Sequence, residues 1–431
     1  MIFNPVILSV TAMMVLCLLK LNVIIAILIS ALIAGVAAGM GLGETMSILI
    51  NGMGGNSETA LSYILLGTLA VAINNSGLAK IIALKISGIV KDKKYLLIFI
   101  LAGIACSSQN LIPVHIAFIP ILIPPLLTLM NKLKIDRRAV ACALTFGLKA
   151  PYIVLPVGFG LIFQTIVKDQ LNANNVPITL EGVSSVNWIL GLGMFLGLLT
   201  AVFFSYRKPR EYKMKEDENK SSESYAFEKK HLFALIGAVI AFGVQLKTGS
   251  LPLGALFALI FMAVTNVIPW KHIDETLDGG LHLMGFIAFV MLVAAGYGNV
   301  IRETGAVPEL VEGVIGIIGT NKILGAFVML LVGLFVTLGI GTSFGTIPIL
   351  AVIYCPLAVS LGFTPAGTAV LVAAAGALGD AGSPASDSTL GPTAGLNADG
   401  QHQHIWDTCV PTFLHYNIPL IIFGLIGSLI F

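Results

Sequence analysis

The chain has 431 residues, of which 57% are hydrophobic and only 11% are charged. A water-soluble core cannot hide that much apolar surface, and the alternating segments of about ten residues that a β-barrel requires are absent from the sequence. The composition therefore predicts an all-α polytopic membrane protein. The net charge of +2 is small, and no basic surface with interleaved aromatic residues indicates nucleic-acid binding.

The first half of the chain, residues 1–205, contains two apolar stretches with polar interruptions. Residues 95–130 are predicted to form a re-entrant hairpin, with Ser107-Ser108-Gln109-Asn110 near its tip. Residues 139–165 are predicted to form a broken helix, with the break at Gly147-Leu148-Lys149-Ala150-Pro151. Unpaired backbone groups at membrane depth are tolerated only where protein or a water-filled cavity satisfies them, so both interruptions indicate a functional region.

Residues 206–231 form the only long polar stretch, and they mix both signs of charge. This composition predicts a solvated linker that joins two halves.

The second half, residues 232–431, repeats the pattern of the first. Residues 323–360 are predicted to form a second hairpin, interrupted at Gly341-Thr342-Ser343-Phe344-Gly345-Thr346. Residues 366–390 are predicted to form a second broken helix, interrupted at Gly379-Asp380-Ala381-Gly382-Ser383-Pro384. Matched interruptions in two halves of a membrane protein indicate the binding site of a secondary transporter.

The placement of positive charge predicts how the halves are related. If both hairpins are re-entrant, 19 of the 24 Lys and Arg residues fall on one side of the membrane, and this side is predicted to be cytoplasmic. The linker then lies in the cytoplasm, and the two hairpins open to opposite sides. Ile119-Pro120-Ile121-Leu122 recurs as Ile347-Pro348-Ile349-Leu350, and the same shift places Lys149 near Asp380. These observations predict two inverted repeats.

Charged side chains at membrane depth are costly, so Lys149, Asp380 and Asp387 are the main candidates for function. The candidate substrate contacts are Ser107, Ser108, Gln109, Asn110, His115, Thr342, Ser343, Gly345, Thr346 and Asp387. The candidate ion-binding or coupling residues are Lys149, Asp380, Ser383, Ser386 and Asn75. Other interpretations stay open: a buried Lys149–Asp380 pair that locks the halves together, a helix cap at Asn75, and a core histidine at His115. No metal other than Na⁺ and no other cofactor is predicted.

The C-terminal region resembles a known family. The run from Gly379 to Thr389, the motif Asn397-Ala398-Asp399-Gly400 and the motif Trp406-Asp407-Thr408 resemble the YuiF-like proteins. These are relatives of NhaC-type Na⁺/H⁺ antiporters in the ion transporter superfamily. The resemblance implies inverted repeats, Na⁺ sites between hairpin tip and unwound segment, and elevator-type movement in a homodimer. It also implies amino acid transport, with histidine as a proposed substrate.

Together these features predict a multi-pass secondary transporter of the inner membrane that carries a small amino acid with Na⁺ or H⁺. Asp380 and Asp387 would bind the cation or the substrate ammonium, and the hairpin tips would contact the substrate carboxylate. The Lys149 ammonium would take the place of one Na⁺. Na⁺/H⁺ exchange is the main alternative and an ion channel a more distant one. No set of nucleophile, base and orienting residue indicates an enzyme.

Overall fold

The computed structural model describes residues 3–19, 21–78, 81, 93–110, 119–213, 228–340, 342–384 and 386–431. All regular structure in these ranges is helical, which confirms the predicted all-α class. Five of the described helices are long and apolar enough to cross a membrane, or six if one bent pair counts as a single span, and several shorter helices are also apolar. The chain is therefore a multi-span membrane protein.

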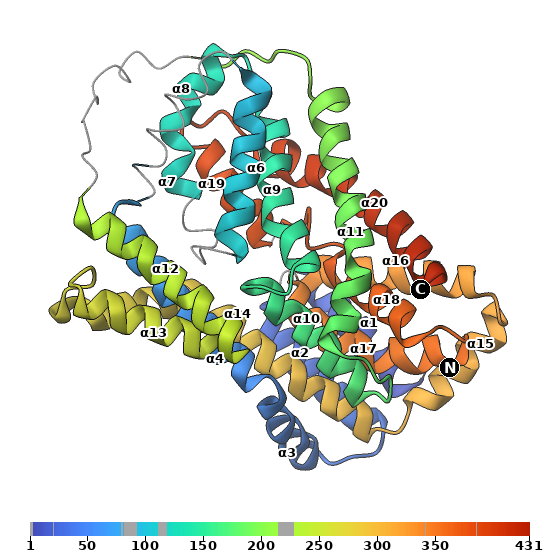
Figure 1. Ribbon diagram of the computed structural model, residues 1–431. Coiled ribbons are helices and arrows are strands. Elements are labelled where there is room, and N and C mark those ends of the chain that lie inside the picture. The colour runs from blue at the N-terminus through green and yellow to red at the C-terminus, as the bar shows by residue number, and fades with distance from the viewer. Residues whose placement is uncertain are drawn as a thin grey trace.

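One group of helices packs around α14 (Ile273–Glu303), the longest described helix. It lies against α2 (Val23–Ala37), α3 (Leu42–Met53) and α4 (Ser57–Asn75). α12 (Lys229–Thr248) pairs with α13 (Leu251–Val264), and α13 in turn packs on α4 (Figure 1). Many large apolar side chains of α12 and α13 remain exposed, for example Val239, Phe257 and Val264. Such a surface suits contact with lipid rather than with water.

A second group contains the predicted first hairpin, formed by α6 (Lys94–Asn110), α7 (Ile119–Leu122) and α8 (Pro124–Lys132). The Lys94 ammonium donates to the carbonyl of Arg207 over 3.1 Å, and the backbone N–H of Arg210 donates to the carbonyl of Lys134 over 3.1 Å. The start of α6 and the end of α8 therefore lie at the same end of the molecule, which we call the linker end. The side chains of Ser108, Gln109 and Asn110 and the whole of His115 lie outside the described residues.

The predicted second hairpin is formed by α16 (Lys322–Ile340) and α17 (Ser343–Ser360), which pack against each other. The Lys322 ammonium donates to the carbonyl of Gly362 over 2.6 Å, so this hairpin also returns to the end where it starts. That end carries Thr364, whose hydroxyl donates to the carbonyl of the C-terminal Phe431 over 2.5 Å. We call it the terminal end. α15 (Val307–Ile318) and α1 (Pro5–Leu18) lie beside this hairpin.

The two ends are separated by the length of α20 (Val410–Ile430). The π-helical segment that precedes it, η6 (His404–Cys409), places Asp407 against Arg210 at the linker end, with 2.8 Å between carboxylate and guanidinium. The other end of α20 meets Thr364. A helix of this length spans about 30 Å, close to the thickness of a bilayer core. Both ends of the first predicted hairpin therefore lie at the linker end, and both ends of the second predicted hairpin lie at the terminal end.

The first broken helix consists of α9 (Arg137–Val154) and α10 (Phe159–Ala173), which are bent by 48°. The position predicted for the break, Gly147 to Pro151, is wrong, because α9 continues through it. A Cβ atom on Gly147 would lie 2.6 Å from the carbonyl oxygen of Ala102 in α6, so this glycine serves close helix packing and not unwinding. The helix ends at Val154, three residues after Pro151, whose ring removes a backbone donor.

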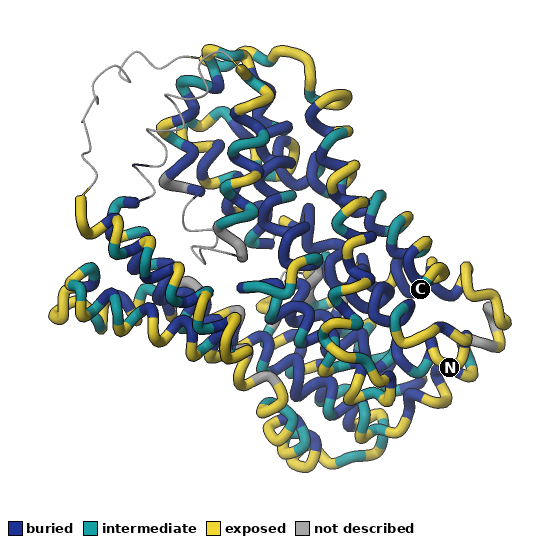
Figure 2. Tube along the Cα trace, viewed as in Figure 1, coloured by how far each residue is buried: buried dark blue, intermediate teal, exposed yellow. Residues whose placement is uncertain are grey.

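α18 (Pro365–Ala377) and α19 (Asp387–Leu396) flank residues 378–386, which are not helical where described. The second predicted interruption lies in this segment. α9, α17 and α18 run through the most buried part of the fold (Figure 2). α11 (Leu180–Thr200), extended by η3 (Ala201–Ser205), lies alongside α9 and α20 and covers them on one side.

Candidate functional site

Asp380 is the centre of the polar cluster, with only 1% of its surface exposed. Its Oδ2 atom accepts from the Lys149 ammonium at 2.5 Å, from the backbone N–H of Ser343 at 3.1 Å and from the Ser343 hydroxyl at 2.5 Å. Its Oδ1 atom accepts from the Ser386 hydroxyl at 2.5 Å. The structure thus brings four predicted residues together, from α9, the tip of the second hairpin and the segment 378–386. A buried carboxylate is retained when it is paired and hydrogen-bonded in this way.

The segment 378–386 adopts its shape because glycine permits it and nearby side chains satisfy it. Gly379 and Gly382 have φ values of 78° and 111°, which are unfavourable for residues with a side chain. The Asn417 amide of α20 accepts from the N–H of Gly379 over 2.7 Å and donates to the carbonyl of Ala381 over 2.6 Å. The Thr389 hydroxyl donates to the carbonyl of Ser383 over 2.5 Å. Backbone groups released from helix geometry are therefore paired inside the protein.

Asp387 begins α19 next to this cluster, but its carboxylate has no hydrogen bond or ion pair among the described residues. It is partly buried and interacts electrostatically with Lys149 and Asp380. The ammonium of Lys149 lies 5.2 Å from the ring centre of Tyr152, and the Tyr152 hydroxyl bonds the Ser343 hydroxyl over 2.7 Å. Asp387 is thus a carboxylate with free acceptor capacity beside Asp380, both of whose oxygens already accept hydrogen bonds.

The other predicted residues lie in less direct positions. The Thr346 hydroxyl donates to the carbonyl of Thr342 within the hairpin tip, where Gly345 is also buried. The Ser383 hydroxyl donates to the carbonyl of Leu338 over 3.2 Å. Ser107 bonds within its own helix and borders a groove of about 530 Å³ between α6, α9 and α11. Asn75 is exposed at the end of α4 and makes no hydrogen bond to Asp380, so the ion-binding role predicted for it gains no support.

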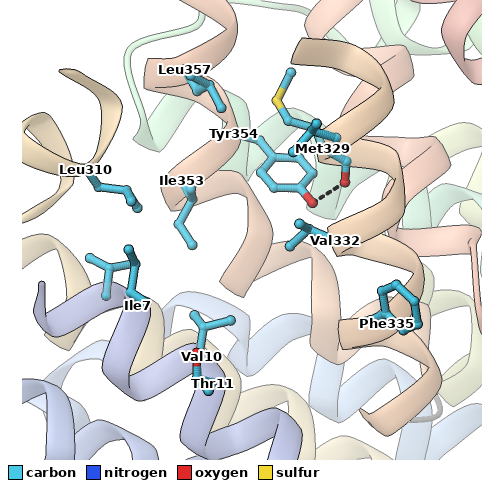
Figure 3. Close-up of a pocket in the computed structure, with 12 residues that line it drawn as sticks. Ile7, Val10, Thr11, Leu310, Met329, Val332, Phe335, Ile353, Tyr354 and Leu357 are labelled. Carbon is cyan, nitrogen blue, oxygen red and sulfur yellow. Dashed lines mark hydrogen bonds between the residues drawn. The ribbon is translucent and has the colours of Figure 1, made fainter. Parts of the chain in front are cut away.

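A second hollow of about 330 Å³ lies behind the second hairpin. Figure 3 shows its lining of apolar side chains from α1, α15, α16 and α17, among them Val10, Leu310, Val332 and Ile353. The hydroxyl of Tyr354 donates to the backbone carbonyl of Met329 in α16. This hollow has no charged lining residue and is separate from the Asp380 cluster.

The segment 397–407 packs at the linker end, where Arg137 with Asp399 and His402 with Thr408 form two contacts that we call the clamp. Arg137, with 0% exposed surface, contacts the Asp399 carboxylate at 2.5 and 2.7 Å. Its guanidinium also lies 4.2 Å from the ring of Tyr212 at the start of the linker. Burial lowers the pKa of His402 to about 4, so its imidazole is neutral at pH 7 and bonds the Thr408 hydroxyl over 2.7 Å. These side chains hold the segment 397–407 against α9 and the start of the linker.

Comparison with known proteins decides the family. The sequence profile of the Na⁺/H⁺ antiporter family matches residues 143–425. The chain belongs to this family. A second Na⁺-H⁺ antiporter family profile matches residues 4–90. The protein is therefore a membrane transporter and not an enzyme, as predicted.

Three relatives of this antiporter-family chain match over nearly their whole length. A Vibrio parahaemolyticus protein described as uncharacterized membrane protein VP2115 is 51% identical over 99% of this chain and 100% of its own. An uncharacterized membrane protein of Haemophilus influenzae is 47% identical over 100% of both chains. YuiF of Bacillus subtilis, provisionally named an amino acid transporter, is 47% identical over 99% of this chain and 100% of its own. The resemblance to YuiF-like proteins is confirmed.

Two solved structures share the fold. The YdaH transporter of Alcanivorax borkumensis has a TM-score of 0.59 and 14% identity, over 90% of this chain and 88% of its own. MtrF of Neisseria gonorrhoeae, described within a class of antimetabolite efflux pumps, has a TM-score of 0.57 and 12% identity, over 90% and 84%. At this identity the likeness extends to the fold alone.

Sequence reasoning missed Asn417 and Tyr152. Asn417 is detectable in principle, since an amide in the middle of an apolar helix must find partners. Tyr152 has no such signal, because tyrosine is common in membrane helices.

Proposed function

We propose that this protein is a secondary transporter that carries a small amino acid together with Na⁺ or H⁺. Histidine is the first candidate substrate, on the basis of the YuiF resemblance. The observation that carries the proposal is the Asp380 cluster, where a hairpin tip, a bent helix and an unwound segment meet at a buried carboxylate. Ion and substrate sites of secondary transporters are built from such discontinuous elements near the membrane midplane.

The orientation of the hairpins supports two inverted repeats, residues 1–205 and 232–431, joined by the linker 206–231. The first hairpin opens at the linker end and the second at the terminal end. We assign the linker end to the cytoplasm because most Lys and Arg residues fall there. Movement of one part of the protein relative to the other would expose the Asp380 cluster to each side of the membrane in turn. The family resemblance implies that this movement is of the elevator type and takes place in a dimer.

The chemistry of the cluster supports coupling to one cation. The Lys149 ammonium occupies the position beside Asp380 that a Na⁺ ion would take, and the hydroxyl oxygens of Ser343 and Ser386 lie within reach of the same carboxylate. Hard cations prefer oxygen ligands of this kind. Na⁺ binding at Asp380 would therefore require Lys149 to move away. The free Asp387 carboxylate is suited to the substrate ammonium.

The experiment is uptake of labelled histidine and a panel of amino acids into proteoliposomes, with and without an inward Na⁺ gradient. We expect the Na⁺ gradient to drive uptake in the wild-type protein. Asp380→Asn should abolish this uptake, whereas the control Glu211→Gln, in the exposed linker, should retain it. Absence of uptake for every amino acid tested would refute the proposal.

Na⁺/H⁺ exchange is the second candidate, because the family is described by that activity. Asp380 would then bind Na⁺ and H⁺ alternately. A lumenal pH indicator, used without amino acid, distinguishes the two. Proton efflux evoked by Na⁺, with no amino acid uptake, would identify an antiporter.

A further inference from the structure

An aromatic box surrounds the residue that follows Ser343 at the tip of the second hairpin. The box consists of Tyr63 of α4, Tyr152 of α9 and Phe163 of α10, and Phe159 of α10 packs against Tyr63 at 5.4 Å. The ring of Phe344 stacks on Tyr152 at 5.5 Å with an interplanar angle of 29°. It also meets Tyr63 edge-on at 5.3 Å and Phe163 edge-on at 6.2 Å. Phe344 is 5% exposed, so one phenyl ring fills the space between these three rings.

Two polar groups at the box lack partners. The Tyr63 hydroxyl belongs to a side chain that is only 1% exposed, and it has no hydrogen-bond partner among the described residues. The Asp387 carboxylate, which interacts electrostatically with Tyr63, is only partly buried and makes no hydrogen bond or ion pair within the described part of the chain. A buried hydroxyl is normally hydrogen-bonded, so the unpaired Tyr63 hydroxyl calls for an explanation such as a polar ligand atom.

Phe344 is held in the box by its neighbour. The backbone N–H and the hydroxyl of Ser343 both bond Asp380, and the same hydroxyl bonds Tyr152. Withdrawal of the hairpin tip would therefore break the Ser343–Asp380 contacts and remove the Phe344 ring from the box in one movement. The cation site and the aromatic box would open together.

We propose that the aromatic box is the side-chain subsite for the transported amino acid, that it selects single-ring side chains, and that Phe344 fills it when no substrate is bound. The proposal rests on the amino acid transport proposed above. The substrate ring would take the place of the Phe344 ring, stacked on Tyr152 with its edge toward Tyr63, a favourable arrangement for aromatic pairs. Its ammonium would bind Asp387, and a polar ring atom would bond the Tyr63 hydroxyl.

The space left by one phenyl ring defines the selectivity. Phenyl, phenol and imidazole side chains fit it, whereas an indole is larger and a branched aliphatic chain cannot stack. Selection by aromatic stacking predicts that phenylalanine and histidine compete for uptake better than leucine, which has similar bulk but no ring.

The first test measures inhibition of labelled substrate uptake by phenylalanine, histidine and leucine in proteoliposomes. Phenylalanine and histidine are expected to inhibit at concentrations about tenfold lower than leucine. Equal inhibition by leucine, with Na⁺-driven uptake intact, would overturn the aromatic subsite and leave amino acid transport standing. Absence of uptake for every amino acid would overturn both proposals.

The second test uses Tyr63→Phe, which removes the unpaired hydroxyl and keeps the ring. The inhibition constant of histidine is expected to rise about tenfold, while that of phenylalanine stays unchanged. The matched control is Tyr297→Phe, because the Tyr297 hydroxyl is also buried but bonds Ser9 over 2.9 Å outside the box. An unchanged histidine constant in Tyr63→Phe, in protein that elutes and melts like wild type, would overturn the proposal.

The third test uses Phe344→Leu, which keeps an apolar side chain at the tip but removes the competing ring. Single-ring substrates are expected to bind more tightly, with a several-fold fall in KM for phenylalanine and no change for leucine. An unchanged KM for phenylalanine would overturn the role of Phe344.

Discussion

The Nζ atom of Lys149 lies 2.5 Å from Oδ2 of Asp380, and both side chains are largely hidden from solvent. The two residues come from opposite halves of the chain. A buried ion pair is costly to desolvate, so a contribution to stability is a weak explanation for this pair. The pair is better explained if the Lys149 ammonium can be exchanged for another cation. We regard Lys149 as the cation that occupies the Asp380 site in the absence of Na⁺.

Lys149→Ala tests this exchange. Loss of one partner of a buried pair leaves an uncompensated charge, which costs about 3–5 kcal/mol in the absence of another cation. We expect the variant to melt at lower temperature without Na⁺ and to recover most of the loss as Na⁺ is added. The same titration on wild type should give a smaller Na⁺ response. A coupling ratio of two or more Na⁺ per substrate in wild type would contradict the exchange.

Ser343→Ala removes the hydroxyl that donates to Asp380 and keeps the backbone N–H contact. Hydrogen bonds to charged groups contribute about 1.5–3 kcal/mol, so the Na⁺ concentration for half-maximal uptake should rise at least about tenfold. Ser428→Ala is the control, since that buried hydroxyl bonds only within α20. An unchanged Na⁺ dependence in Ser343→Ala would remove this hydroxyl from the cation site.

Asn417→Leu leaves the N–H of Gly379 and the carbonyl of Ala381 without their partners. Each unpaired buried group costs about 1–3 kcal/mol, so the variant should be markedly less stable and inactive. Asn172→Ala, whose amide bonds the carbonyls of Lys168 and Ile178 at the exposed end of α10, should change the melting temperature little. Thermal melting in detergent, followed by uptake, checks both. Wild-type activity in Asn417→Leu would show that the segment 378–386 does not need this amide.

The sequence alone was sufficient for the helical class and for Lys149, Ser343 and Ser386, which meet at Asp380. Charged residues in apolar stretches are rare enough to be informative. The break in the first bent helix was placed wrongly, because Gly147 can serve either unwinding or close packing, and only the neighbouring Ala102 decides between them. The aromatic box was not predictable, since Tyr63, Tyr152 and Phe344 are far apart in the chain and aromatic residues are ordinary in membrane helices.

The clamp at the linker end should make stability depend on pH through His402. Burial lowers the pKa of this imidazole from about 6.5 to about 4, so the unfolded chain binds a proton more readily than the folded one. Its contribution is fully present above pH 6.5 and is lost as the pH falls toward 4, by about 3 kcal/mol. The melting temperature in detergent should therefore fall across this range.

His402→Gln removes the titrating group and should flatten this part of the pH profile, although it also lowers stability at pH 7 through the lost bond to Thr408. His272→Gln serves as control, because His272 is an exposed residue paired with Glu275 on the surface. The pKa of Asp399 is also lowered, since the bonds from Arg137 outweigh the opposing effect of burial, and this adds a further loss below pH 4. An equally steep profile between pH 6.5 and 4 in His402→Gln would assign the acid sensitivity to groups other than His402.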